Sequence, residues 1–109
     1  MNPKLVGQCF VVHGRLTLAN GNPSVRIWQV GTKHMLGALD SNGNDIDDID
    51  KFPRQIRPLI PKDPWQMEIF GDYTVCPFTH ERAGWMQFVC IASARHLVAR
   101  NRMEPDTKP

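Results

Sequence analysis

The residues best suited to chemistry are the three cysteines and the histidines that follow two of them. Cys76 and Cys90 each lie in a short apolar run, and turn-forming residues separate the two runs. Two neighbouring strands joined by such a turn would bring the sulfurs together, so we expect a Cys76–Cys90 disulfide, which closes a loop of about 15 residues. The alternative is a pair of buried free thiols. Cys9 would then be an unpaired thiol or would bond to another chain.

The same cysteines could instead belong to a metal site. Cys76, His80, Cys90 and His96 offer two thiolates and two imidazoles, which is an acceptable tetrahedral set for zinc. Their spacing matches none of the common zinc motifs, and Pro77 restrains the first pair. We therefore expect a protein without zinc. A small zinc-binding protein or a thiol enzyme that uses these four residues is the alternative hypothesis.

An acidic segment, residues 40–50, invites comparison with calcium-binding loops. Asp40, Asn42 and Asn44 stand at the first, third and fifth positions of an EF-hand-like loop, and their oxygens suit a hard cation. However, the sixth position is Asp45 rather than glycine, and the twelfth is Lys51 rather than glutamate. The prediction is therefore a solvated loop that binds no cation.

Catalytic signatures are missing from the sequence. The serines lie outside a nucleophile-elbow motif, and the chain has neither a glycine-rich phosphate loop nor a dinucleotide-binding fingerprint. A cysteine beside a histidine is not enough for thiol catalysis without a third group that orients the base. We therefore predict a non-catalytic protein that needs no cofactor.

The tryptophans favour a binding surface. Trp28 has the opposite parity to Val25 and Ile27, so if those two side chains point inward, Trp28 and Arg26 share the outer face. A tryptophan beside an arginine is typical of protein interfaces. We expect a protein partner or self-association at this surface, and the alternative is that Trp28 belongs to the core.

Short strands must position all of these residues. Apolar and polar residues alternate over residues 9–19, 24–30 and 34–39, and Asn-Gly-Asn-Pro at 20–23 and Gly-Thr at 31–32 are turn signals between them. Further strands are expected over residues 65–70, 73–76 and 85–91. Together they predict an all-β fold, a small antiparallel β-sandwich of the prealbumin or immunoglobulin type.

Parts of the chain fall outside this pattern. Residues 40–64 are rich in aspartate and then contain four prolines, which predicts one long irregular connection. Residues 92–102 have apolar residues at helical spacing and predict a short C-terminal helix. Residues 103–109 are polar and are expected to be a disordered tail, so the predicted domain spans residues 1–102.

The order of the turn motifs resembles that of transthyretin-like (prealbumin-like) β-sandwich modules, which include the carboxypeptidase regulatory-like domains. Gly14, Asn22-Pro23, the Asp-Ser-Asn-Gly of residues 40–43 and the Gly-Asp-Tyr-Thr-Val of residues 71–75 follow one another in that family's order. The resemblance covers residues 10–76 and implies a sandwich. The acidic and proline-rich connection departs from the family pattern, and the resemblance does not extend to the segment that joins Cys76 to Cys90.

Composition limits the remaining possibilities. A chain of 109 residues is one domain by size, and its net charge of +2 is too small to indicate nucleic-acid binding. No apolar run approaches the roughly 18 residues that a membrane span requires, and the first residues given do not resemble a signal peptide. A disulfide indicates an oxidising compartment. We therefore predict a periplasmic or secreted binding or structural module whose signal peptide has been removed, or a cytoplasmic one if the cysteines are reduced.

Overall fold

The computed structural model describes residues 5–101, which form five strands and three short 3-10 turns. The strands are β1 (Phe10–Leu18), β2 (Val25–Gln29), β3 (Met35–Leu39), β4 (Met67–Pro77) and β5 (Gln87–Asn101). The 3-10 turns are η1 (Ile49–Lys51), η2 (Arg57–Leu59) and η3 (Pro64–Gln66), and all of them lie between β3 and β4.

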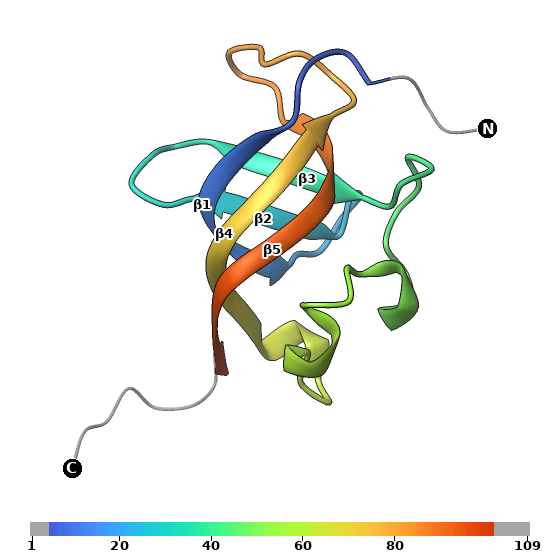
Figure 1. Ribbon diagram of the computed structural model, residues 1–109, viewed down its shortest axis with the longest axis vertical. Helices are drawn as coiled ribbons and strands as arrows, with labels where there is room; N and C mark the ends of the chain where they lie inside the picture. Colours follow the sequence, from blue (N-terminus) through green and yellow to red (C-terminus); the bar gives the residue numbers. More distant parts are fainter. Residues whose placement is uncertain (1–4, 102–109) are drawn as a thin grey trace.

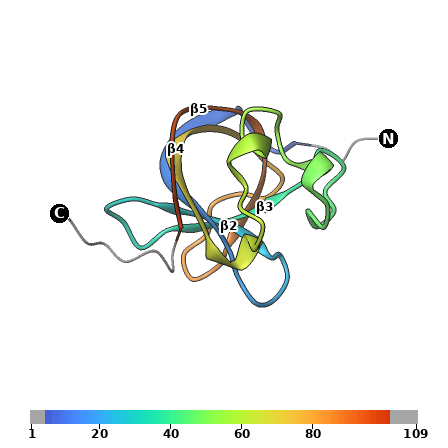
Figure 2. The same ribbon diagram turned by 90° about the horizontal axis from the view of Figure 1, so that it is seen from below.

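The strands form a single sheet that closes on itself as a barrel, and the end-on view in Figure 2 shows the ring. The order is β1-β2-β3-β5-β4, and β4 pairs back onto β1. Every neighbouring pair is antiparallel except β3 and β5, which run parallel. This connectivity is that of the OB-fold, a five-stranded Greek-key barrel. The all-β class is confirmed, but one closed sheet replaces the expected two-layer sandwich.

The predicted C-terminal helix is wrong, because residues 92–101 continue β5. This long strand pairs first with β3 and then with almost the whole length of β4, so its backbone groups are satisfied by the sheet instead of by a helix. Ala94 is buried, and Leu97 packs against the core from the same strand. The apolar spacing that suggested a helix therefore arises from a strand interrupted by register shifts. Arg102 and the predicted disordered tail, residues 103–109, lie outside the described residues.

The barrel interior is filled by the alternate residues of each strand. On β1, Val12 and Leu16 are buried, whereas Val11 and His13 point outward. Tyr73 on β4 is fully buried, and its hydroxyl donates a hydrogen bond to the backbone carbonyl of Ile69. Burial raises the pKa of Tyr73 well above its ordinary value, so this phenol is a core residue rather than an acid or base.

The connection between β3 and β4 was predicted to be irregular, and it contains only isolated turns. It is nevertheless part of the folded core, because Ile46, Phe52 and Ile56 are buried in the same cluster as the strand residues. Figure 1 shows this segment, in green, lying against the end of the barrel that is opposite to the β4–β5 loop. The connection therefore covers one end of the barrel and leaves the other end to the loops.

Candidate functional site

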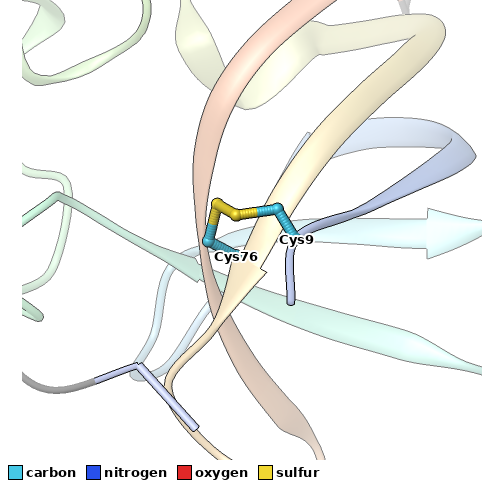
Figure 3. Close-up of a disulfide and its surroundings, with 2 residues drawn as sticks. All are labelled: Cys9 and Cys76. Carbon is cyan, nitrogen blue, oxygen red and sulfur yellow. A yellow bond between two sulfur atoms is a disulfide. The ribbon is translucent and has the colours of Figure 1, made fainter. Parts of the chain in front are cut away.

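The disulfide in the structure joins Cys9 to Cys76, and Cys90 is a half-buried free thiol. The predicted Cys76–Cys90 pairing is therefore wrong. Figure 3 shows the bond running from the residue before β1 to β4. The prediction did place the right strands together, because Cys76 and Cys90 are register partners on β4 and β5. It failed because β4 has a second neighbour, β1, and Cys9 precedes Cys76 by 67 residues in the sequence.

The alternative zinc set does not assemble. Cys76 is oxidised and supplies no thiolate, His80 is exposed in the β4–β5 loop, and His96 contacts Asp72 instead. In the part of the chain that the structure describes, residues 5–101, no group of three or more histidine, cysteine, aspartate or glutamate side chains is arranged to hold a metal ion.

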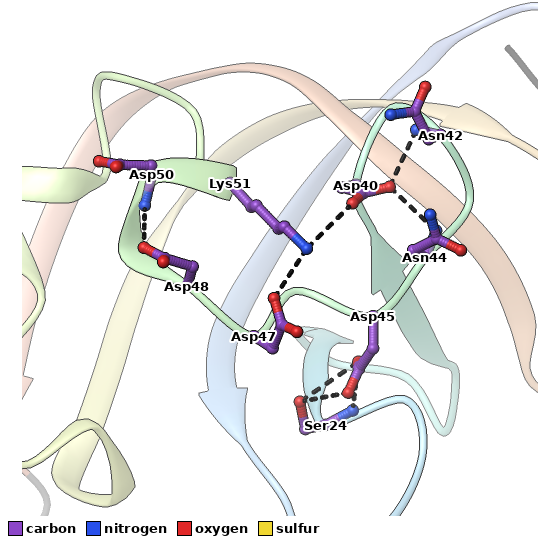
Figure 4. A network of polar contacts seen from close by, with 9 residues as sticks. All are labelled: Ser24, Asp40, Asn42, Asn44, Asp45, Asp47, Asp48, Asp50 and Lys51. Atoms are coloured by element: carbon purple, nitrogen blue, oxygen red, sulfur yellow. Dashed lines mark hydrogen bonds and ion pairs between the residues drawn. The ribbon is translucent and has the colours of Figure 1, made fainter. Parts of the chain in front are cut away.

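The acidic segment uses its oxygens to fold itself, as Figure 4 shows. One carboxylate oxygen of Asp40 accepts hydrogen bonds from the backbone amides of Asn42 and Asn44, both at 2.9 Å. The other oxygen lies 3.9 Å from the ammonium of Lys51, which also forms an ion pair with Asp47 at 2.7 Å. The Lys51 hydrogen bond and charge lower the pKa of Asp47. A lysine therefore stands where a calcium loop would need an acidic ligand.

The predicted Arg26 and Trp28 surface lies on the outer face of β2, but local contacts occupy both side chains. Trp28 is half-buried, its indole donates a 2.7 Å hydrogen bond to the carbonyl of Thr32, and the guanidinium of Arg15 lies 4.9 Å from its ring centroid. Arg26 donates a hydrogen bond of 3.1 Å to the carbonyl of Pro23. Both side chains are therefore engaged in contacts that stabilise the turns beside β2.

A carboxylate between two histidines was not anticipated from the sequence. Asp72 on β4 lies between His13 on β1 and His96 on β5, and the Nδ1 atoms of the two imidazoles are 2.9 and 2.8 Å from its two oxygens. An ionised carboxylate only accepts hydrogen bonds, so both imidazoles carry their proton on Nδ1. The hydrogen bond from His13 and then that from His96 lower the pKa of Asp72.

The backbone of β5 is distorted where His96 enters this cluster. His96 has a φ of 57°, in the left-handed region that few non-glycine residues adopt. Gly71 lies beside this distortion, and a Cβ on it would overlap the side chain of Leu97 and lie 3.1 Å from the carbonyl oxygen of Arg95. The glycine therefore permits the close approach of β5 that brings His96 to Asp72.

This cluster predicts a pH-dependent contribution to stability. A carboxyl group whose pKa is lower in the folded state stabilises the fold above its unfolded pKa, near 4, and loses that effect as the pH falls through the folded value. We expect Asp72→Asn to lower the free energy of unfolding at neutral pH, and the difference from wild type to shrink below about pH 4. Urea unfolding between neutral pH and about pH 3 measures this difference. Asp50→Asn, which changes an exposed aspartate elsewhere, is the control, and an equal effect of the two variants would contradict the assignment.

One concave surface is a groove at the end of the barrel where β1 begins. It has a volume of about 650 Å³ and lies between the first residue of β1, the β2–β3 turn and the β4–β5 loop. Its apolar lining includes Phe10, Met35, Trp85 and Met86, and its polar lining includes Lys33, His34, Glu81 and Arg82. Trp85 is the most exposed aromatic side chain of residues 5–101, at 67% of its full surface.

Local contacts hold the β4–β5 loop, and with it Trp85. The guanidinium of Arg82 stacks 4.8 Å from the centroid of the Trp85 ring, and the backbone of Trp85 donates to the carbonyl of Arg82 at 3.0 Å. Gly84 supplies the positive φ of 81° that this tight turn requires. Where the loop meets β5, the hydroxyl of Thr79 accepts a 2.9 Å hydrogen bond from the amide of Phe88. The loop thus presents the tryptophan instead of burying it.

Known proteins offer no comparison for this site, because no family model, no curated protein and no solved structure matches the chain. The resemblance to transthyretin-like modules therefore stays a prediction. Among the described residues, no helix has the length and apolar character needed to cross a membrane.

Proposed function

We propose that the chain is a non-catalytic binding module that holds a segment of a partner protein in the groove beside the β4–β5 loop. The observation that carries this proposal is Trp85, a large apolar side chain that the fold keeps exposed at the rim of a concave surface. Burial of this side chain in the core would stabilise the fold more than its exposure does. Tryptophan and arginine are also the residues that most often dominate binding energy at protein interfaces.

The lining suggests what the partner segment carries. Met35 and Met86 are unbranched and polarizable, so they adapt to differently shaped apolar side chains. Lys33 and Arg82 place positive charge at the rim, whereas the carboxylate of Glu81 lies 3.5 Å from His34. A segment with an aromatic or aliphatic anchor next to an acidic residue fits this distribution. Most of the groove lining comes from the β2–β3 turn and the β4–β5 loop, so the segment would bind through side chains rather than by adding a strand.

Fold and redox chemistry are consistent with this role. In OB-folds the loop between the fourth and fifth strands takes part in binding oligonucleotides and oligosaccharides, so this analogy supports the position of the site and not the class of ligand. The Cys9–Cys76 bond suits an oxidising compartment, so we place the protein outside the cytoplasm.

A phage-displayed library of random peptides tests the proposal with a defined probe. Peptides selected on the wild type should combine an apolar anchor with an acidic residue, and Trp85→Ala should weaken their binding by at least about tenfold. Arg82→Glu should weaken the acidic peptides by a similar factor. Trp65→Ala is the matched control, since Trp65 is 49% exposed and is not part of the groove lining.

Two results would contradict the proposal. One is a set of peptides whose affinities are equally insensitive to Trp85→Ala and to Trp65→Ala. The other is a single-stranded oligonucleotide that binds through Trp85 and Arg82 more tightly than any selected peptide, because stacking aromatics beside positive charge also suit nucleic acid. That result would assign the groove to a different class of ligand.

A further inference from the structure

The three cysteines stand in a row across three neighbouring strands. β4 lies between β1 and β5 in the barrel. Cys9, immediately before β1, is bonded to Cys76 on β4 with a Cα–Cα distance of 4.0 Å, and Cys90 on β5 is the register partner of Cys76 on the other side. Directly opposed residues of an antiparallel pair project from the same face with their Cβ atoms about 5 Å apart. Cys76 therefore has one bonded and one unbonded sulfur neighbour.

We propose that this row is a thiol–disulfide exchange site in which Cys76 changes its partner from Cys9 to Cys90. The Cys90 thiolate attacks the sulfur of Cys76, and a new Cys76–Cys90 bond forms as the Cys9–Cys76 bond breaks. The electron pair of the broken bond leaves with Cys9, which takes up the proton that Cys90 released. One disulfide and one thiol exist before and after the step, so it needs no outside oxidant or reductant.

The arrangement of the strands favours this reaction. Attack on a disulfide requires the nucleophile, the central sulfur and the leaving sulfur to approach a line, and Cys90 and Cys9 reach Cys76 from strands on opposite sides of β4. Burial raises the pKa of the Cys90 thiol, and hydrogen bonds from the backbone of Cys90 and Cys76 oppose this rise. The exchange should therefore be slow at neutral pH and faster in alkaline solution.

The exchange would alter the end of the barrel that carries the groove. It releases β1 from its covalent link to β4 at Cys9, next to Phe10, which lines the groove. It also moves the free thiol from half-buried Cys90 to exposed Cys9. The effect on the groove rests on the proposed function, whereas the exchange itself does not, so the two can fail separately.

Mapping the disulfide in the full chain tests the exchange directly. Trypsin cleaves after lysine and arginine and separates the cysteines into the peptides 5–15, 63–82 and 83–95. Protein kept at about pH 5, blocked with N-ethylmaleimide and digested without reduction should contain the Cys9–Cys76 pair. After incubation at about pH 9 before blocking, a Cys76–Cys90 pair should appear, with a rate that is independent of protein concentration and rises about tenfold per pH unit below the thiol pKa.

Two variants complete the test. Cys9→Ser should form the Cys76–Cys90 bond under the oxidising conditions that form the native bond in wild type, whereas Cys90→Ser should keep only Cys9–Cys76 at every pH. The proposal is overturned if wild type shows only Cys9–Cys76 after alkaline incubation while Cys9→Ser keeps two free thiols. It is overturned equally if the new pair appears only between chains, at a rate that rises with protein concentration.

Discussion

Cys9→Ser introduced into a Cys90→Ser background is expected to lower the free energy of unfolding by about 4 kcal/mol, because it opens a loop that spans 67 residues. Such a crosslink limits the conformations of the unfolded chain, and the limitation grows with loop length. The loss would be a large share of the stability of a domain of this size. Cys9 is exposed, so the serine itself should cost little in the folded state.

The background variant makes this measurement interpretable. With Cys90 replaced, no second partner remains for Cys76, so the double variant reports the loss of the crosslink alone. Urea unfolding without reductant, followed by tryptophan fluorescence, compares the double variant with Cys90→Ser. Added reductant should bring Cys90→Ser down to the stability of the double variant and leave the double variant unchanged. A loss below about 1 kcal/mol would show that the bond contributes little to this fold.

Cys9→Ser alone connects this prediction with the exchange site. If Cys76 then pairs with Cys90, the replacement loop of about 15 residues should recover about 3 kcal/mol of stabilisation. The single variant should therefore be clearly more stable than the double variant under oxidising conditions, and the two should become equal after reduction.

The cysteine pairing was predicted only in part from the sequence. Alternation and turn residues located a strand within each of the five, although β4 was expected as two strands and residues 92–102 as a helix. Their local order predicted correctly that Cys76 and Cys90 lie on paired strands. Closure of the barrel brings β1 against β4, and this contact between distant segments leaves no periodic signal in either strand. The bond to Cys9 depends on that contact, so it could not be predicted from local patterns.

The same reason explains what was missed at the surface. Asp72, His13 and His96 come from three strands, and only the barrel brings them together. Trp85 was expected to begin the strand over residues 85–91, whereas β5 begins at Gln87 and Trp85 lies in the β4–β5 loop. Trp28 was the expected anchor because its parity suggested an outer face, but its contact with the β2–β3 turn leaves no local pattern in the sequence.

The connection between β3 and β4 carries the second large prediction. Its aspartates indicated a solvated loop over residues 40–50 and its prolines an irregular connection, and within that connection Ile56 is completely buried in the barrel core. We expect Ile56→Ala to lower the free energy of unfolding by about 3 kcal/mol, because it removes buried methyl groups and leaves a cavity. Ile49→Ala is the matched control from the same connection, since Ile49 is 48% exposed, and it should cost less than about 1 kcal/mol.

Urea unfolding of both variants with the disulfide intact distinguishes a solvated connection from one that packs into the barrel core. A solvated connection would make the two substitutions equally mild, whereas a connection that closes the barrel makes them differ by a factor of three or so. The distinction matters for the groove, which lies at the other end of the barrel. If the connection seals one end with Ile46, Phe52 and Ile56, the barrel is a rigid support, and ligand binding is left to the β2–β3 turn and the β4–β5 loop.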